Sequence, residues 1–500
     1  MSHFQPPADG VDGNANSGHF SDYLGAIETL QSCMRPNGEA HDNSPAAIRA
    51  RAITRLERIR AFLAFLGNPQ DAYQIVHVGG TSGKGSTSVA IAGILAAAGY
   101  RTGLHTSPYL QSATEKLQVN SQLVAGTTFR ALVEGVIERA TVWAEETVQR
   151  EPLTYGEVST ALTFLYFARQ QVNVAVIEVG AGGRFDLTNV VMPTISVITS
   201  IGLDHIVTLG STIPEIAWHK AGIIKHGTPV VTAVTDPIAL KPIFDEATAR
   251  EAPVLRVDAD QTYQVISRGP IHSTWREIDG RGQRGPEFVT ALPGEVQVTN
   301  AATAVAAIRV LSKRGWLIDN EAIWSGLATA RLPGRVERMP VKDTAPVLID
   351  GAHNPQKMCA VAADIDRLLG RPSLTVRPIA VVGSIRGKDT RAMLRCLTPH
   401  VSAIVGTRAE VDGKESTSPE EIVDAARAIG FSGRLAATPR PLAAVDLATE
   451  WATSAQTAVV VTGSLFLVGE VRDRWYALRE IVTQRTSWPV HSQVSGHNPE

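Results

Sequence analysis

Apolar residues occur along this chain in short continuous runs, separated by longer segments in which they recur at helical spacing. The runs in the first half of the chain lie at residues 73–78, 102–106, 172–179, 194–200 and 229–234. Continuous β-branched runs are typical of strands that are buried on both faces of a parallel sheet. The helical segments lie at about 46–66, 88–98, 128–149, 159–170 and 214–222. This alternation predicts an α/β domain built on a parallel sheet.

The same alternation returns in the second half of the chain, after a break. Residues 254–297 contain short alternating pieces typical of an antiparallel hairpin region, and a helical segment follows at 300–313. After Leu332-Pro333-Gly334-Arg335, strands are predicted at 346–350, 378–384, 401–406 and 457–463, and helices at 356–369, 389–398, 418–429, 440–453 and 467–482. This second pattern predicts a smaller, doubly wound Rossmann-like domain.

These patterns divide the chain into two domains and two tails. We predict a P-loop ATPase-type parallel-sheet domain over residues 21–331 and the Rossmann-like domain over residues 332–485. Residues 1–20 are rich in polar residues, glycine and proline, and offer too little apolar surface to offset the entropy of ordering, so we expect this tail to be disordered. Residues 486–500 are polar, and we expect them to form a loose tail.

A glycine-rich turn, Gly80-Thr81-Ser82-Gly83-Lys84-Gly85-Ser86, joins the strand at 73–78 to the helix that follows it. The backbone N–H groups of such a turn and of the helix N-terminus form a cradle for phosphate. Lys84 supplies a positive charge for the β- and γ-phosphates, and Ser86 or Thr87 supplies a hydroxyl near the metal. The turn departs from the pattern G-x-x-x-x-G-K-[ST], because Val78 replaces the first glycine and Gly85 separates Lys84 from Ser86. We interpret it as a shortened phosphate-binding loop.

Three polar residues follow the ends of three predicted strands. Ser107 follows the strand at 102–106, Glu178 lies at the end of the strand at 172–179, and His205 follows the strand at 194–200. Open α/β sheets bind ligands at the carboxyl ends of their strands. Two oxygen ligands and one nitrogen ligand beside a phosphate loop suit a magnesium ion. We therefore predict a metal site at this edge of the sheet.

Composition excludes several classes of protein. The chain has 500 residues, is 44% hydrophobic and has a formal net charge of −2, so neither a nucleic-acid partner nor a charged membrane surface is indicated. The N-terminus lacks the basic start and apolar core of a signal peptide, and no apolar run reaches the roughly 18 residues of a membrane span. Cys33, Cys359 and Cys396 lie far apart without C-x-x-C spacing, and we interpret them as reduced thiols. We expect a cytoplasmic protein.

The chain also contains a series of short motifs: the loop Gly80–Ser86, Thr106–Pro108, Glu178–Asn189, Ile198–His205, Lys220–Lys225, Asn300–Ala304, Leu332–Arg335, Asp350–Pro355 and Gly463–Glu470. In their sequence and order, over about residues 50–483, these motifs resemble those of folylpolyglutamate synthase and dihydrofolate synthase, members of the Mur ligase superfamily.

The resemblance implies an ATP-dependent amide ligase that transfers the γ-phosphate of ATP to a pteroate or folate carboxylate, and then joins the amine of L-glutamate to it. Lys84, Lys220 and His205 would be catalytic. The family pattern implies that Ser107 and Glu178 hold one Mg²⁺ and that His205 helps to hold a second. Lys220 matches a lysine that the family carbamylates, although its helical spacing alone indicates a solvated lysine. The residues implied to bind ATP are Gly80, Thr81, Ser82, Gly83, Lys84, Gly85, Ser86, Asn300, Arg335 and Asp350.

The acceptor site is implied by Thr154-Tyr155-Gly156-Glu157, which resembles a T-x-F-E segment near the family's pterin site. Gly156 removes the aromatic ring that would stack there. Two further departures are Ser82, where the family usually has Asn, and His219, where it usually has Glu. His353 lies in the same motif as Asp350.

Other functions remain open at this stage. A ligase of the same superfamily that joins an amino acid to a different carboxylate acceptor would usually carry an additional N-terminal domain, whereas here only some 70 residues precede the phosphate loop. A nucleotide switch would have the phosphate loop but would not explain the second domain, and a dinucleotide-binding oxidoreductase would need G-x-G-x-x-G spacing, which is missing. We expect a monomer whose partners are the small molecules ATP, L-glutamate and dihydropteroate or a reduced folate, with no nucleic acid and no membrane.

Overall fold

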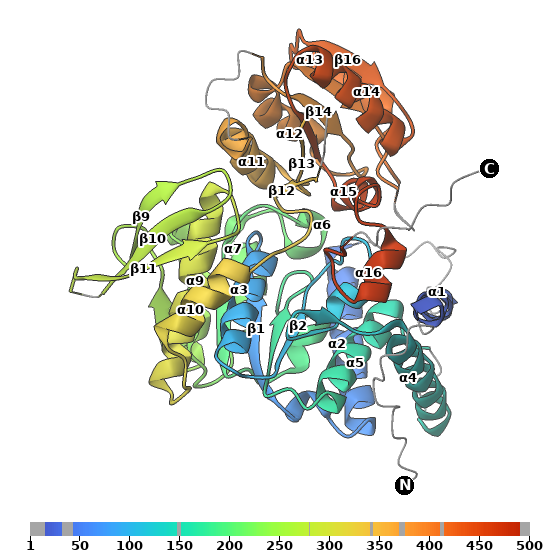
Figure 1. Ribbon diagram of the computed structural model, residues 1–500. Coiled ribbons are helices and arrows are strands. Elements are labelled where there is room, and N and C mark those ends of the chain that lie inside the picture. Colours follow the sequence, from blue (N-terminus) through green and yellow to red (C-terminus); the bar gives the residue numbers. More distant parts are fainter. Residues whose placement is uncertain are drawn as a thin grey trace.

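The computed structural model of the chain describes residues 16–32, 44–147, 152–279, 281–340, 344–369, 376–410 and 415–490 (Figure 1). The strands are β1 (Gln74–Gly79), β2 (Thr102–His105), β3 (Gln118–Val119), β4 (Gln122–Leu123), β5 (Val174–Glu178), β6 (Ile195–Ile198), β7 (Val230–Thr232), β8 (Val254–Arg256), β9 (Tyr263–Arg268), β10 (Ser273–Ile278), β11 (Arg284–Thr290), β12 (Glu337–Arg338), β13 (Val347–Ile349), β14 (Ile379–Val382), β15 (Ala403–Gly406), β16 (Arg434–Ala437) and β17 (Val459–Thr462).

The helices connect these strands in the alternation that the sequence predicts. They are α1 (Asn16–Ser32), α2 (Pro45–Phe65), α3 (Lys84–Ala97), α4 (Gly126–Glu146), α5 (Tyr155–Arg169), α6 (Ile206–Leu209), α7 (Ile213–Ala221), α8 (Pro237–Ala249), α9 (Glu295–Lys313), α10 (Asn320–Thr329), α11 (Pro355–Leu368), α12 (Thr390–Leu397), α13 (Pro419–Ala428), α14 (Pro441–Ser454), α15 (Leu465–Arg472) and α16 (Leu478–Gln484). No helix in the described ranges is long and apolar enough to cross a membrane.

The first sheet has eight strands in the order β4-β3-β2-β5-β1-β6-β7-β8. Strand β1 lies between β5 and β6 and is parallel to both, and the pairs β2–β5, β6–β7 and β7–β8 are also parallel. Only β3 and β4, at one edge, are antiparallel. The predicted parallel-sheet domain is therefore confirmed.

Both faces of this sheet are covered by helices, which is why its strands are continuously apolar. Val76 and Val78 of β1 pack with residues of α3, α9 and α10 in one hydrophobic core. Ile75 of the same strand faces the opposite core, to which α1, α2, α4 and α5 contribute. A strand that is buried on both faces has no polar side to alternate with.

The region at 254–297 forms the predicted antiparallel hairpins, apart from residues 295–297, which begin α9, and one strand. Strands β9, β10 and β11 make a three-stranded antiparallel sheet that projects to one side of the molecule (Figure 1). Trp275 of β10 is fully buried and joins this sheet to the core beneath α9. The strand outside these hairpins is β8, which extends the large sheet.

The second sheet has six strands in the order β12-β13-β17-β14-β15-β16. All of its pairs are parallel except β12–β13. Residues of α11, α12 and α13 pack in the core on one face, and residues of α14 and α15 pack in the core on the other. This is the predicted doubly wound arrangement.

Several predicted boundaries are wrong. The helix expected at 467–482 is two helices, α15 and α16, because the chain turns at 473–477 and the Asp473 carboxylate accepts a hydrogen bond from the Leu478 amide (2.7 Å). The predicted disordered tail at 1–20 contains the start of α1 at Asn16, because that helix packs on α4. Residues 1–15 lie outside the described residues.

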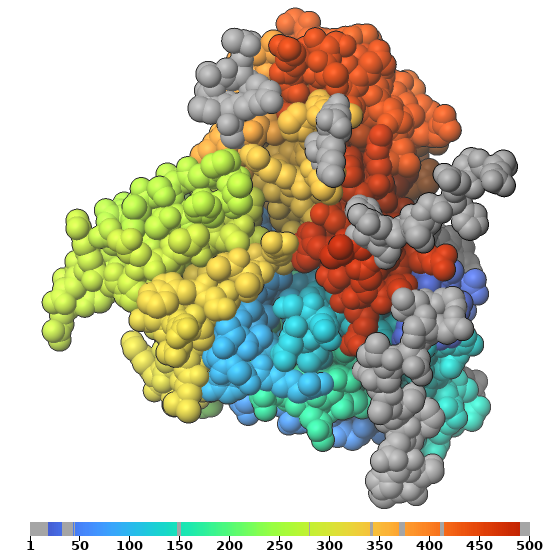
Figure 2. Space-filling model, in the orientation of Figure 1, coloured from blue at the N-terminus to red at the C-terminus, as the bar shows by residue number. Residues whose placement is uncertain are grey.

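The second predicted tail, at 486–500, is ordered where it is described. Ser487 is buried and its carbonyl oxygen accepts a hydrogen bond from Arg472 Nη2 (2.7 Å), while Trp488 Nε1 donates to Glu337 Oε1 (2.8 Å). Helix α16 packs on α1 of the first domain, and Figure 2 shows this red segment against the cyan surface of that domain. Residues 491–500 lie outside the described residues.

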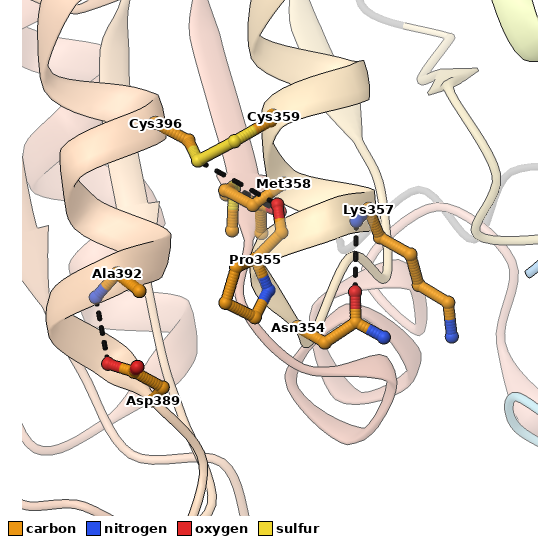
Figure 3. Close-up of a disulfide and its surroundings, with 9 residues drawn as sticks. Asn354, Pro355, Lys357, Met358, Cys359, Asp389, Ala392 and Cys396 are labelled. Atoms are coloured by element: carbon orange, nitrogen blue, oxygen red, sulfur yellow. Dashed lines mark hydrogen bonds between the residues drawn. A yellow bond between two sulfur atoms is a disulfide. The ribbon is translucent and has the colours of Figure 1, made fainter. Parts of the chain in front are cut away.

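The prediction of reduced thiols is wrong for two of the three cysteines. Cys359 of α11 and Cys396 of α12 form a disulfide, with their Cα atoms 4.8 Å apart (Figure 3). They are 37 residues apart in sequence, and only the packing of α11 against α12 brings them together. Spacing along the chain therefore gave no sign of the pair. Cys33 lies outside the described residues.

We predict that alkylation will reveal this disulfide. When the purified protein is unfolded without reductant and treated with iodoacetamide, intact-mass measurement should find only Cys33 modified, whereas prior reduction should expose all three thiols. In a Cys396→Ser variant, Cys33 and Cys359 should both react without reductant. Modification of all three wild-type cysteines without reductant would contradict the disulfide.

Candidate active site

The register of the parallel strands brings the predicted site residues to one edge of the first sheet. Val78 pairs with Glu178, and Gly79 pairs with Ile198, so the ends of β5 and β6 flank the start of the phosphate loop. Ser107 follows β2, and its backbone N–H donates a hydrogen bond to Glu178 Oε2 (3.0 Å). The carboxyl ends of four strands thus converge on the loop.

The phosphate loop is held in place by the segment after β6. The Thr81 amide donates to the Ser200 carbonyl oxygen (2.7 Å), and the Ser82 amide donates to Ser200 Oγ (3.0 Å). Thr199 Oγ1 in turn donates to the Ser82 carbonyl oxygen (2.6 Å). A loop tied at several points is fixed before a ligand arrives, so less entropy is lost on binding.

Two glycines of the loop are explained by what lies beside them. Gly83 caps α3 with φ +86°, and a Cβ there would lie 2.2 Å from Asn300 Oδ1. Gly85 separates Lys84 from Ser86, and a Cβ there would lie 3.0 Å from Leu332 Cδ2 and 3.4 Å from Glu178 Oε2. The absence of a Cβ at Gly85 therefore avoids a tight contact with Leu332, whereas the distance to the Glu178 carboxylate would be an ordinary van der Waals contact.

Two cavities meet at this loop. The first, here called the phosphate-loop cavity, is lined by Gly80–Ser86 and also by Ser107, Glu178, His205, Lys220 and Arg335. The second, here called the interdomain cavity, has a volume of about 220 Å³ and is lined by residues of both domains. The predicted ATP-binding residues on its wall are Ser82, Gly83, Ser86, Asn300, Arg335 and Asp350. The residues predicted to hold the metal and the residues predicted to bind ATP therefore line two adjoining cavities.

The Glu178 carboxylate is suited to hold a cation. Burial raises its pKa, and the nearby Lys84 opposes that shift. The Ser107 amide is its hydrogen-bond donor within the described residues, which leaves carboxylate lone pairs directed to the cavity. Among the residues that the structure describes, no three His, Cys, Asp or Glu side chains gather as a metal site. The predicted ligands Ser107, Glu178 and His205 are not such a group, because only two of them are His, Cys, Asp or Glu and the third is a serine.

Asp350 is anchored at the start of the second domain. Its two carboxylate oxygens accept hydrogen bonds from the Val336 amide (2.9 Å) and the Ala352 amide (2.8 Å). Burial raises the pKa of Asp350, and Arg335 opposes the shift. Asp350 therefore fixes the backbone around Arg335 and also lines the interdomain cavity.

Lys220 is not the solvated lysine that its helical spacing alone indicates. Its side chain is buried in α7, and Nζ donates to the Gly80 carbonyl oxygen (2.8 Å). Burial and the nearby Lys84 lower the pKa of Lys220 to about 7, so a large fraction of it is neutral at neutral pH. A neutral lysine amine is a nucleophile.

The predicted acceptor segment, Thr154–Glu157, has a structural role. Glu157 is fully buried and pairs with Arg58, whose Nε donates to Oε1 (2.7 Å). The other carboxylate oxygen of Glu157 accepts from the Thr154 amide and from its hydroxyl (both 2.7 Å), which caps α5. A Cβ on Gly156 would lie 3.0 Å from Arg55 Nη2.

A third and larger cavity, of about 1560 Å³, borders α2 and is here called the α2 cavity. Its wall includes Arg49, Arg55, Phe185, Trp218 and His219, and it shares Ala181 and Gly182 with the phosphate-loop cavity. The guanidinium of Arg49 lies 4.7 Å from the centre of the Trp218 ring. No local sequence pattern marked Arg49, Phe185 and Trp218 as residues of one site, because they lie on separate elements and only the fold brings them together.

Asp204 and Lys357 were also missed as site residues. Asp204, beside His205 in the first domain, accepts hydrogen bonds from Lys388 Nζ (3.1 Å) and Asn354 Nδ2 (3.2 Å) of the second domain. Lys357 lies one helical turn after His353 and lines both the phosphate-loop and interdomain cavities. Its position two residues after the segment Asp350–Pro355 was the one available signal.

Comparisons with known proteins agree with this arrangement. Residues 78–308 match the model of the Mur ligase middle domain, and residues 336–474 match that of the dihydrofolate synthetase C-terminal domain. The folylpolyglutamate synthase of Lacticaseibacillus casei is 35% identical over 83% of this chain and 93% of its own. The dihydrofolate synthase/folylpolyglutamate synthase of Bacillus subtilis is 34% identical over 84% of this chain and 94% of its own.

A solved structure extends the likeness to the fold. Mycobacterium tuberculosis folylpolyglutamate synthase complexed with ADP superposes with a TM-score of 0.79 and 28% identity, covering 91% of this chain and 99% of that one. The phosphate loop, the two doubly wound domains and these matches lead to one assignment. The chain belongs to the folylpolyglutamate synthase and dihydrofolate synthase family and is an ATP-dependent, ADP-forming carbon–nitrogen ligase.

Proposed function

We propose that this ligase adds L-glutamate both to dihydropteroate and to reduced folates. The observation that carries the proposal is that the α2 cavity adjoins the phosphate-loop cavity through Ala181 and Gly182. A carboxylate at the inner end of the α2 cavity would then lie beside the γ-phosphate of ATP. The Bacillus subtilis relative is named for both activities, dihydrofolate synthase and folylpolyglutamate synthase.

The proposed reaction has two steps. A carboxylate oxygen of the acceptor attacks the γ-phosphorus of ATP, the bond to the ADP oxygen breaks, and an acyl phosphate forms. The neutral amine of L-glutamate then attacks the acyl carbon, inorganic phosphate leaves, and the amine proton is released. Phosphorylation is needed because a free carboxylate is a poor electrophile and has no good leaving group.

We assign the charged groups of the phosphate-loop cavity to the first step. Lys84 and the N-terminus of α3 bind the phosphates, and Arg335 and Asn300 position the nucleotide from the interdomain cavity. Ser107 and Glu178 would hold one Mg²⁺ and His205 would help to hold a second. When bound, Mg²⁺ neutralises the negative charge that develops on the transferred phosphoryl group.

We assign the acceptor to the α2 cavity. Phe185 and Trp218 offer flat apolar surface for a pterin ring, and Arg49 and Arg55 offer positive charge for carboxylates of a reduced folate. Thr154–Glu157 borders this cavity, since a Cβ on Gly156 would lie 3.0 Å from Arg55 Nη2 and 3.1 Å from Leu187 Cδ1, two residues of its wall. A side chain at Gly156 would displace them.

Turnover should depend on an acceptor. With Mg-ATP and L-glutamate, we expect ADP release with dihydropteroate and with tetrahydrofolate, and almost none without an acceptor. Lys84→Ala should lower the rate by roughly a thousandfold or more, as expected when charge stabilisation of a transferred phosphoryl group is lost. ADP release with only one acceptor would restrict the proposal to that substrate, and release with neither would overturn it.

Lys220 should carry a carbamate. A neutral amine adds to carbon dioxide, so native intact-mass measurement in bicarbonate buffer should find the mass of one carbon dioxide added to the wild-type protein and not to Lys220→Ala. Lys220→Ala should lose activity and regain part of it with acetate or propionate, which replace the carbamate oxygens. Lys225→Ala is the matched control, because Lys225 lies outside the phosphate-loop cavity and donates to the Asn189 carbonyl oxygen (3.1 Å). An unmodified Lys220, with no rescue of Lys220→Ala, would contradict the prediction.

Gly83 and Gly99 provide a matched pair for testing the phosphate loop. Both have left-handed backbone, with φ of +86° and +88°, but a Cβ on Gly99 would meet nothing within 4 Å, whereas one on Gly83 would meet Asn300. Each change to alanine should cost about 1 kcal/mol of folding free energy from backbone strain. Only Gly83→Ala should also weaken ATP binding, by roughly tenfold or more, since a displaced Asn300 and loop lose at least one hydrogen bond to the nucleotide. Equal ATP affinities in the two variants, measured by calorimetry, would refute this role of the loop.

A further inference from the structure

Among the described residues, five line both the phosphate-loop cavity and the interdomain cavity. Four of them, Ser82, Gly83, Ser86 and Arg335, are residues to which ATP binding has already been assigned. The fifth is Lys357 of α11, to which neither the family resemblance nor the mechanism above gives a role. A nucleotide whose base lies in one cavity and whose phosphates lie in the other must pass these five residues.

The position of Lys357 on its helix directs it to this junction. Asn354 caps α11, and its Oδ1 accepts a hydrogen bond from the Lys357 amide (2.9 Å). Figure 3 shows this bond and the Lys357 side chain extending away from the Cys359–Cys396 disulfide on the same helix. Lys357 therefore sits in the first helical turn, where the helix N-terminus also favours an anion.

His353 holds the Lys357 amine in place. His353 Nδ1 lies 2.8 Å from the Gly351 carbonyl oxygen, which only accepts, so Nδ1 carries the proton and Nε2 carries the lone pair. Lys357 Nζ lies 3.0 Å from Nε2 and donates to it. An ammonium has three N–H groups, so two remain to donate to a ligand.

The charges around Lys357 favour an anionic ligand there. None of the ion pairs found among the described residues includes Lys357, and the cations Lys84, Arg335 and Lys388 are close enough to repel it, against the attraction of Asp204. Burial first, and then these cations, lower the pKa of Lys357 to about 7. A triphosphate would compensate the repulsion among Lys84, Arg335 and Lys357 together.

We propose that Lys357 is a second phosphate-binding lysine, which donates to the phosphate groups of bound ATP at the junction of the two cavities and stabilises the transferred phosphoryl group together with Lys84. Lys84 comes from the first domain, whereas Lys357 and Arg335 come from the second. The full set of cations is therefore present only when the two domains lie against each other. This inference depends on the proposed function only for ATP binding in these two cavities.

The test is nucleotide binding by Lys357→Gln, Lys357→Arg and the control Lys313→Gln, an exposed lysine at the end of α9. Lys357→Gln should weaken binding of the analogue AMPPCP by roughly tenfold to a hundredfold, the range expected for a lost charge-assisted hydrogen bond. Lys357→Arg should retain part of the affinity, and Lys313→Gln should bind as the wild type does. In turnover assays, Lys357→Gln should raise the KM for ATP and lower kcat while leaving the KM for L-glutamate unchanged.

An unchanged AMPPCP affinity in Lys357→Gln, or an effect confined to the KM for L-glutamate, would overturn the proposal. Because the binding assay contains no acceptor, its result is independent of whether dihydropteroate and folates are the substrates. A second measurement uses the wild-type protein and so does not depend on folding of a variant. Mg-AMPPCP should protect Lys357 from acetylation by acetic anhydride, as followed by peptide mass spectrometry, and L-glutamate alone should not. An unprotected Lys357 would equally overturn the proposal.

Discussion

The parallel pairing of β1 with β5 and β6 is the constraint on which the rest of the site depends. In a parallel sheet the carboxyl ends of neighbouring strands lie at the same edge, and the register here pairs Val78 with Glu178 and Gly79 with Ile198. A one-residue shift of β5 would turn Glu178 to the other face of the sheet. The cores packed against both faces of β1 oppose such a shift, because its buried side chains would have to be repacked, so the core positions the chemistry.

The phosphate-loop cavity gathers cationic side chains that repel one another. Lys84, Lys220, Lys357 and Arg335 all line the phosphate-loop cavity, and burial and mutual repulsion lower the pKa values of both Lys220 and Lys357 to about 7. Glu178 lies buried opposite them with a raised pKa. A bound triphosphate would reduce the repulsion among the lysines and Arg335, and its cations would stabilise the charged form of Glu178. Preorganised charge of this kind favours the charged transition state, because no solvent has to reorganise.

Sequence patterns predicted the parts of the structure that depend on local order. The buried strands, the phosphate loop and the strand-end residues Ser107, Glu178 and His205 were identified because each leaves a signal within about ten residues. The half-exposed edge strand β16 has no continuous apolar run and was missed. The Cys359–Cys396 disulfide, the burial of Lys220 and the aromatic wall of Trp218 and Phe185 depend on contacts between distant elements. No local pattern encodes such contacts, so only the fold could reveal them.

The second domain completes the site, and buried polar contacts determine how it sits. Arg472, fully buried in α15, donates to both oxygens of Glu337 (2.8 and 2.9 Å) and to Gln111 Oε1 of the first domain (2.6 Å). At the site itself, Asp204 accepts from Lys388 and Asn354 across the same junction. Charged contacts of this kind are directional, and an unpaired buried charge is costly, so only a narrow range of domain orientations satisfies them. The residue that caps α11, Asn354, thus both orients the helix that carries Lys357 and joins it to the loop that carries His205.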